Sequence, residues 1–106
     1  MKIFDGHNDI LNKINHSEDP KNTRAFLERG EGHLDFPRAT KAGFAGGFFA
    51  VYSSDPPSVS PFVDRKILTD DGFYFNLSPP LDYDYAHQSA LSMIDLLLNI
   101  ENDSSG

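Results

Sequence analysis

The hydrophobic pattern of the chain opens with a short apolar run close to the N-terminus. Ile3-Phe4 comes directly before the polar residues 5–9, which are followed by Ile10-Leu11. The residues from 12 to 16 are again polar and mixed. An apolar start bounded by polar residues predicts a strand that leads straight into the polar cluster.

A second apolar run covers residues 43–52 and contains two adjacent glycines. From Phe48 to Tyr52 it is apolar on both faces, which is typical of a parallel strand covered on both sides. Gly46-Gly47 lacks the spacing of a phosphate-binding loop and precedes a strand instead of opening a helix, so phosphate binding is not expected. We expect the two glycines to allow close backbone packing.

Two short helices are predicted between these strands. Asp19 is a suitable N-cap for a helix over residues 20–29, and Gly30 is a suitable stop. Asp35 stands before a proline-containing first turn, which predicts that it caps a second helix ending at about Ala42.

The clearest helix signal runs from Tyr85 to about Glu101, with Asp82 or Asp84 as its N-cap. Polar residues step by four, three and four, which predicts one solvent-facing stripe made of Gln88, Ser92, Asp95 and Asn99. The side expected to be buried consists of Ala86, Ala90, Leu91, Met93, Ile94, Leu97, Leu98 and Ile100. This apolar side is wider than the rest of the chain can cover.

The segment before this helix, about residues 53–81, is rich in Pro, Ser and Asp and is interpreted as an insertion loop. Asp70-Asp71-Gly72 is a turn signal, and an exposed turn is a better interpretation of it than a metal site. The aromatic residues 73–75 supply apolar side chains that the insertion can bury.

The order strand, short helices, apolar strand, long loop and long helix predicts an α/β fold with parallel strands. Two strands do not form a stable parallel sheet, which needs further strands and helices on its faces. We therefore expect residues 1–106 to be the first quarter to third of a larger protein. We also expect the isolated chain to aggregate, because unpaired strands leave open edges.

The composition of the chain argues against several classes of function. The chain has 106 residues, of which 39% are apolar and 24% charged, as expected for a globular protein. Its formal charge of -7 argues against a nucleic-acid surface. The absence of cysteine excludes disulfides and a thiolate zinc site. No apolar run is long enough for a signal peptide or a membrane span, which favours a cytoplasmic location.

The candidate chemistry lies where the first strand ends. Side chains on an extended backbone alternate, so His7 and Asp9 are expected on one side and Asn8 on the other. An imidazole and a carboxylate so placed are half of a site for Zn²⁺ or a similar divalent ion, although an H-x-D triplet also occurs by chance in turns. Asp5 is either a carboxylate that orients a ligand or a turn aspartate bonded to its own backbone.

Other residues that could bind a metal are better explained by structural roles. His33 and Asp35 form a second H-x-D, but capping accounts for Asp35 and a surface position for His33, so neither is assigned to the metal site. His87 is expected at the surface and Met93 in the core. No catalytic residue is assigned within the chain.

Asp5-Gly6-His7-Asn8-Asp9, together with the block at residues 33–52, resembles the membrane (renal-type) dipeptidases, the M19 zinc metallopeptidases, in their bacterial branch. The resemblance implies a (β/α)8 TIM-type barrel with a binuclear zinc site at the C-terminal ends of its strands. His7 and Asp9 would be ligands of one zinc. The bridging glutamate, the histidines of the second zinc and the catalytic aspartate would lie beyond Gly106.

The activity implied by this resemblance is hydrolysis of dipeptides, including those with a C-terminal D-residue, by a water that two metals activate. Residues 1–106 would be the N-terminal part of one metallopeptidase domain and inactive alone. Two alternatives remain open. One is another barrel metallohydrolase of the amidohydrolase type, which commonly begins with H-x-H where this chain has Asp9. The other is a non-catalytic interaction module that binds a partner through the apolar helix face.

Overall fold

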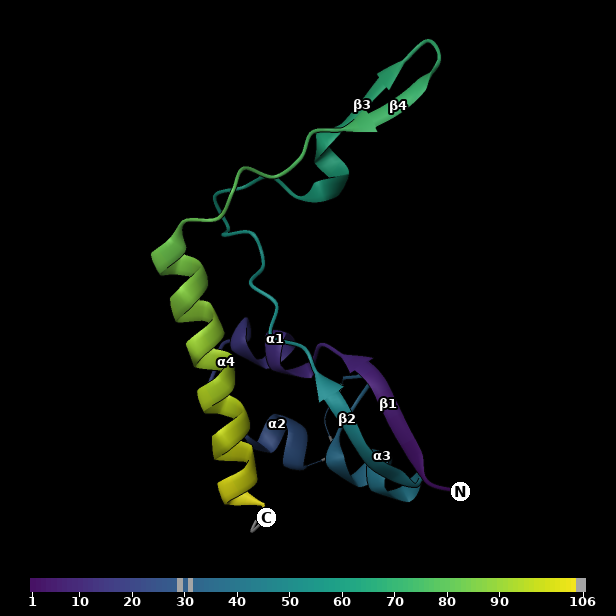
Figure 1. The fold of residues 1–106 in the computed structure, drawn as a ribbon, viewed down its shortest axis with the longest axis vertical. Helices are drawn as coiled ribbons and strands as arrows, with labels where there is room; N and C mark the ends of the chain where they lie inside the picture. Colours follow the sequence, from purple (N-terminus) through teal and green to yellow (C-terminus); the bar gives the residue numbers. More distant parts are fainter. Residues whose placement is uncertain (29, 31, 105–106) are drawn as a thin grey trace.

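The computed structural model describes residues 1–28, 30 and 32–104 and shows a mixed α/β chain with two small sheets (Figure 1). Its elements, in chain order, are β1 (Ile3–Asn8), α1 (Ile10–Asn15), α2 (Arg24–Leu27), α3 (Phe36–Lys41), β2 (Phe44–Phe49), the 3-10 helix η1 (Phe62–Arg65), β3 (Lys66–Thr69), β4 (Gly72–Phe75) and α4 (Tyr83–Asp103). The predicted α/β class is confirmed as a mixed α/β fold.

Strands β1 and β2 form a parallel pair, as predicted, with Phe4 opposite Gly46 and Asp5 opposite Gly47. The glycines matter because the strands approach closely here. A Cβ at Gly47 would lie 3.0 Å from the Cβ of Asp5, and one at Gly46 would lie 3.2 Å from a ring carbon of Phe4. The close-packing interpretation of the two glycines is confirmed.

The expectation that the second strand is covered on both sides is wrong for the described part of the chain. β2 ends at Phe49, and the side of the strand that carries Phe49 is the one that reaches the core. There Phe49 packs edge-on against Phe26, with ring centroids 5.8 Å apart. On the opposite side the rings of Phe48 and Phe4 contact each other edge-on, with centroids 5.3 Å apart, and both side chains remain largely exposed. Tyr52 is exposed beyond the strand.

The core forms where α1 packs against α4 (Figure 1). Its buried side chains are Ile10, Leu11, Ile14, Phe26, Met93, Leu96 and Ile100. Helix α1 was not predicted, because residues 12–16 are mostly polar. Ile10 and Ile14 nevertheless stand four residues apart, so one face of this short helix is apolar and buried.

Helix α4 confirms the predicted long helix and its N-cap, because the Asp82 carboxylate accepts a hydrogen bond from the Tyr85 N–H at 3.0 Å. The buried face is narrower than predicted. The expected apolar side included Leu91, Ile94, Leu97 and Leu98, which are exposed. Ser92, assigned to the solvent stripe, instead donates to Asn15 Oδ1 at 2.7 Å, because α1 crosses that face of α4.

The helix predicted over residues 20–29 is wrong in its extent and in its cap. Helix α2 covers only Arg24–Leu27 and begins after Thr23, whose side chain donates to Asp103 of α4 at 2.5 Å. Asp19 lies in a turn, in which its carbonyl accepts from the Asn22 N–H at 3.2 Å. Residue 29, the predicted end, lies outside the described residues.

The cap of α3 is confirmed and is the main buried polar contact of the fold. The Asp35 carboxylate is fully buried and accepts from the Arg38 N–H at 2.9 Å, from Arg38 Nε at 2.6 Å and from the Gly30 N–H at 3.2 Å. Burial raises the pKa of the Asp35 carboxyl, but the Arg38 and Gly30 hydrogen bonds outweigh it and hold the pKa below its usual value.

This pKa shift predicts a pH-dependent contribution to stability. A carboxylate whose pKa is lowered in the folded state stabilises above the unfolded pKa of about 3.9, and the contribution disappears as the pH falls through the folded value. The free energy of unfolding should therefore differ most between the wild type and Asp35→Asn above about pH 4. Urea titrations of the complete protein from pH 7 to pH 3 measure this difference in unfolding free energy, which should shrink only at the acid end. For the exposed Glu18→Gln we expect no such gap, and a pH-independent Asp35→Asn gap would contradict the assignment.

The segment interpreted as an insertion loop contains more structure than predicted. After η1, strands β3 and β4 form an antiparallel hairpin with Thr69 opposite Gly72. Asp70 and Asp71 form its exposed turn, as predicted. Figure 1 shows this hairpin projecting away from the helices and from the parallel pair. We call residues 66–75 the hairpin arm.

A hydrogen-bonded cluster closes the base of the insertion. Ser78 Oγ donates to Asp55 Oδ2 at 2.6 Å, and Arg65 Nη2 donates to the same oxygen at 3.3 Å. The arm makes the chain long, with a radius of gyration of 17.0 Å against about 13 Å for a compact domain of this size. None of the described helices combines the length and apolar character that crossing a membrane requires.

Candidate metal centre

The site forms at the C-terminal end of β1, where the chain passes into α1. The Asn8 carbonyl accepts from the Ala50 N–H at 2.9 Å, which continues the pairing with β2 to the end of the strand. The Asp9 carbonyl accepts from the Lys13 N–H at 3.0 Å and begins the helix. His7 is thus the next-to-last residue of the strand, and Asp9 is the N-cap of α1.

The side chain of Asn8 fixes this junction. Its Nδ2 donates to Asp5 Oδ2 at 3.0 Å and to the Phe48 carbonyl at 3.3 Å, and its Oδ1 accepts from the Ile10 N–H at 3.4 Å. Asn8 therefore connects β1, β2 and the start of α1. No role was predicted for Asn8, because its only signal is an amide residue at a strand-to-helix junction.

Asp5 completes the support of the strand end. Its Oδ1 accepts from the His7 N–H at 3.2 Å, while its Oδ2 accepts from Asn8. Of the two interpretations of Asp5, the bond to nearby backbone is therefore confirmed, although Asp5 lies within β1 and not in a turn. A Cβ at Gly6 would meet nothing within 4 Å, so this glycine is not required for a close approach.

His7 and Asp9 point to the same side, as the alternation of an extended backbone predicts. His7 Nε2 lies 3.3 Å from Asp9 Oδ2. Both side chains are open to solvent, with exposed fractions of 67% and 59%. Although Asp9 occupies the N-cap position, its carboxylate makes no capping hydrogen bond. It is turned toward the imidazole instead.

This arrangement fits two ligands of one metal ion. Two ligand atoms on a tetrahedral zinc, each bonded at about 2.0–2.1 Å, lie about 3.4 Å apart. The observed separation of 3.3 Å matches this value, and it also permits a direct hydrogen bond between the two side chains. Imidazole nitrogen and carboxylate oxygen are both common ligands of zinc.

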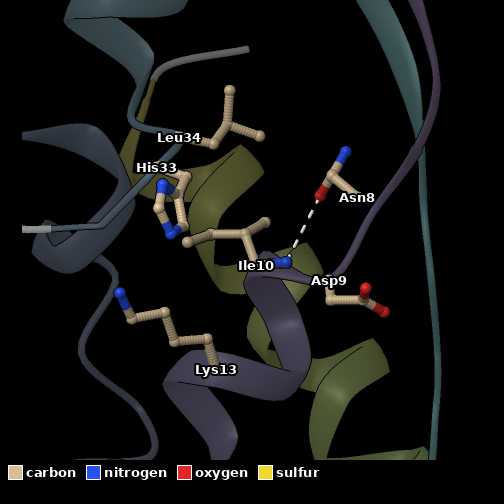
Figure 2. Close-up of a pocket in the computed structure, with 6 residues that line it drawn as sticks. All are labelled: Asn8, Asp9, Ile10, Lys13, His33 and Leu34. Atoms are coloured by element: carbon tan, nitrogen blue, oxygen red, sulfur yellow. Dashed lines mark hydrogen bonds between the residues drawn. The ribbon is translucent and has the colours of Figure 1, made fainter.

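A pocket of about 300 Å³ lies beside the junction and is lined by Asn8, Asp9, Ile10, Lys13, His33 and Leu34. Figure 2 shows the Asp9 carboxylate turned away from His33 and Lys13, with Ile10 between them. His33 is exposed, as expected, and is not brought to the His7–Asp9 pair. The second H-x-D triplet thus stays outside the candidate metal centre.

The described residues hold no group of three or more His, Cys, Asp or Glu side chains that would complete a metal site. His87 is exposed and stacks on Tyr83 with centroids 5.5 Å apart, while Met93 is fully buried. Both fit the structural interpretations given to them. Among the described residues, the His7–Asp9 pair is the arrangement whose geometry fits part of a metal site.

Comparison with solved structures gives matches that extend along the whole of this chain. A crystal structure described as the dipeptidase AC, a metallo peptidase of family M19, is 34% identical to the chain with a TM-score of 0.74. A metallo peptidase from Rhodobacter sphaeroides, solved with a phosphinate mimic of the dipeptide L-Ala-D-Ala, is 31% identical with a TM-score of 0.75. Both matches cover 100% of this chain, but only 27% and 30% of those chains.

Sequence comparison gives a shorter match. An uncharacterized protein in the PQQ-III 3′ region of Acinetobacter calcoaceticus is 49% identical over 53 residues, which are 49% of this chain and 17% of that protein. No protein-family model matches the chain.

Proposed function

The chain resembles the M19 metallo peptidases along its whole length, and on this premise we propose that it forms the N-terminal part of a zinc-dependent dipeptidase. Residues 1–106 would be one portion of a single (β/α)8 barrel domain, with β1 and β2 as its first parallel strands and residues 53–81 as an insertion. The observation that carries the proposal is a match of the whole of this chain to part of such enzymes, combined with a His–Asp pair at a strand end.

In this proposal His7 and Asp9 are ligands of one zinc ion. Their support is the 3.3 Å separation, their exposure, and the Asp9 carboxylate that makes no capping bond. The C-terminal ends of barrel strands are also where such folds carry their chemistry. A zinc centre supplies Lewis-acid polarisation of the scissile carbonyl and activation of a water.

The residues of this chain act by holding and orienting. The imidazole of His7 and the carboxylate of Asp9 bind the cation, and the charge of Asp9 offsets part of the metal charge. Asn8 fixes the backbone between them through β2 and α1. Asp5 holds the His7 N–H and the Asn8 amide in place. The proton-transfer residues and the remaining ligands would come from sequence beyond Gly106.

The proposed substrates are dipeptides. The support is the description of one similar structure as a dipeptidase and of the other as binding a mimic of L-Ala-D-Ala. No residue of this chain has been assigned to the choice of substrate side chain, so this part of the proposal depends on the similarity to those enzymes.

The test uses the complete protein encoded by the reading frame that contains this chain. We expect hydrolysis of L-Ala-D-Ala and about two zinc ions per chain by elemental analysis. A chelator should abolish hydrolysis, and zinc alone should restore it. An N-acetylated dipeptide of the same sequence is the control for the free amino terminus. Full hydrolysis in chelator, or zinc-loaded protein that cleaves no dipeptide, would contradict the function.

A further inference from the structure

Strand β1 contains one residue more than β2 near its C-terminal end. Asp5 is opposite Gly47, and the next pair is Asn8 with Phe49. Two residues of β1, of which His7 is the second, therefore stand opposite a single residue of β2. This arrangement is a β-bulge, a feature that is common next to active sites, where it changes the direction of a side chain. It lies directly before the candidate metal centre.

The extra residue decides which side chains of β1 share a face. On a regular strand residues 5, 7 and 9 would all point to one side. Here Asp5 and Asn8 share a face instead, because their partners on β2 are two residues apart and their side chains bond each other at 3.0 Å. His7 directly precedes Asn8, so its side chain points to the opposite face, where it meets Asp9. The bulge thus separates the Asp5 carboxylate from the His7–Asp9 pair.

Two side chains hold the bulge in place. The Asp5 carboxylate accepts from the His7 N–H at 3.2 Å, which fixes the backbone of the bulged residue. Asn8 Nδ2 donates at 3.3 Å to the carbonyl of Phe48, the residue of β2 that is opposite the bulge. Because the same amide also donates to Asp5, these two side chains form a bridge across the bulge. The backbone that carries the His7 imidazole is therefore fixed from both strands.

Gly47 leaves the space that the Asp5 side chain occupies. A Cβ at this position would lie 3.0 Å from Asp5 Cβ and 3.3 Å from the Asp5 carbonyl oxygen. Asp5 would then have to shift, and the shift would loosen the bridge. Gly46 faces the other side of the sheet, where a Cβ would meet the ring of Phe4 at 3.2 Å. Of these two glycines, Gly47 is the one that contacts the bridge.

We propose that Asp5 and Asn8 are positioning residues that hold the bulge, and that the bulge directs the His7 imidazole toward the metal ion. The same bulge keeps the Asp5 carboxylate out of the coordination sphere. This inference rests on the proposed zinc site. The strand end then supplies two ligands, His7 and Asp9, although three residues with ligand chemistry stand at alternate positions of the sequence. Loss of a neighbour that orients a metal ligand costs about 10–100-fold in metal affinity or activity.

The test measures the zinc affinity of the complete protein by competition with a chromophoric chelator. Asp5→Asn replaces one of two acceptor oxygens by a donor, and Asn8→Asp places a carboxylate against the Asp5 carboxylate. Each single variant should bind zinc about 10–100-fold more weakly than the wild type. Combining the two substitutions exchanges donor and acceptor and restores the bridge, apart from the bond to the Phe48 carbonyl. The double variant should therefore bind zinc more tightly than either single variant.

Cobalt(II) distinguishes a positioning residue from a ligand, because its visible absorption depends on the number and kind of its ligand atoms. At saturating cobalt, Asp5→Asn should keep the wild-type spectrum, whereas Asp9→Asn should alter it. Gly47→Ala should weaken zinc binding with an unchanged cobalt spectrum. Gly46→Ala is the matched control, since it adds the same methyl group on the other face, and it should keep the wild-type zinc affinity.

An altered cobalt spectrum in Asp5→Asn would make Asp5 a ligand and overturn the proposal. Unchanged zinc affinity in both single variants, or equal losses in the two glycine variants, would also overturn it. Should Asp5→Asn fail to fold, the comparison of Gly47→Ala with Gly46→Ala still decides. A complete protein that shows these changes in zinc affinity but cleaves no dipeptide would contradict the proposed function alone, and one that binds no zinc would contradict both.

Discussion

Replacing His7 by alanine, or Asp9 by asparagine, is expected to remove bound zinc from the complete protein and to lower kcat/KM for dipeptides by about a hundredfold or more. Loss of a residue that only orients a ligand costs about 10–100-fold in metal affinity or activity, so loss of a ligand should cost at least as much. His7 and Asp9 are mostly exposed, so their replacement leaves no cavity in the core. Elemental analysis and dipeptide hydrolysis measured on the same sample test this, and a far-UV circular dichroism spectrum identifies a misfolded variant.

His33→Ala is the matched control for this prediction. His33 belongs to the second H-x-D triplet and is exposed, but it lies on the far side of Ile10 from the Asp9 carboxylate (Figure 2). We expect His33→Ala to keep its zinc. If His7→Ala retains full zinc content and activity, the ligand assignment is wrong even though the dipeptidase function stands. Equal zinc loss in both variants would point instead to a general effect on folding.

Leu11→Ala is expected to lower the free energy of unfolding by about 2–5 kcal/mol, the usual cost of removing a buried leucine side chain. Leu11 is 0% exposed and belongs to the cluster that joins α1 to α4. It also follows Asp9 by two residues, so its burial holds the first turn of the helix that begins at the candidate metal centre. Urea unfolding of the complete protein at pH 7, with the dependence of the unfolding free energy on urea concentration compared between wild type and variant, measures the change.

The control is Leu77→Ala. Leu77 is 87% exposed after the hairpin arm, and a surface truncation of this kind changes stability by about 0.5 kcal/mol or less. Similar losses in the two variants would mean that the α1–α4 cluster does not carry the stability assigned to it.

The elements predicted correctly are those whose signals are local. The Asp35 and Asp82 caps lie within three residues of the N–H groups they bind, and the periodicity of α4 spans five turns of its own sequence. Helix α1 was missed because its stability depends on burial against α4, which lies about eighty residues away in the chain. The hairpin was missed because its two strands have four residues each, which are hard to distinguish from a loop.

The candidate metal centre shows the same difference between local signals and contacts distant in the chain. That His7 and Asp9 share one side follows from the alternation of side chains along an extended backbone, even though the strand itself ends at Asn8. The role of Asn8 was not predictable, because one of its partners is the carbonyl of Phe48, 40 positions away. The buried face of α4 was predicted too wide, because periodicity shows which residues are apolar but not how far a crossing helix extends.

The hydrogen bond between Asp55 and Ser78 has a consequence for where the length of this chain can vary. These residues are 23 positions apart and yet in direct contact, so everything between them leaves and re-enters the body at one point. Arg65 also bonds both residues, so we expect that the hairpin arm beyond it can change in length without moving the stems that Asp55, Arg65 and Ser78 hold. Such a change would leave the end of β1, where His7 and Asp9 lie, in place.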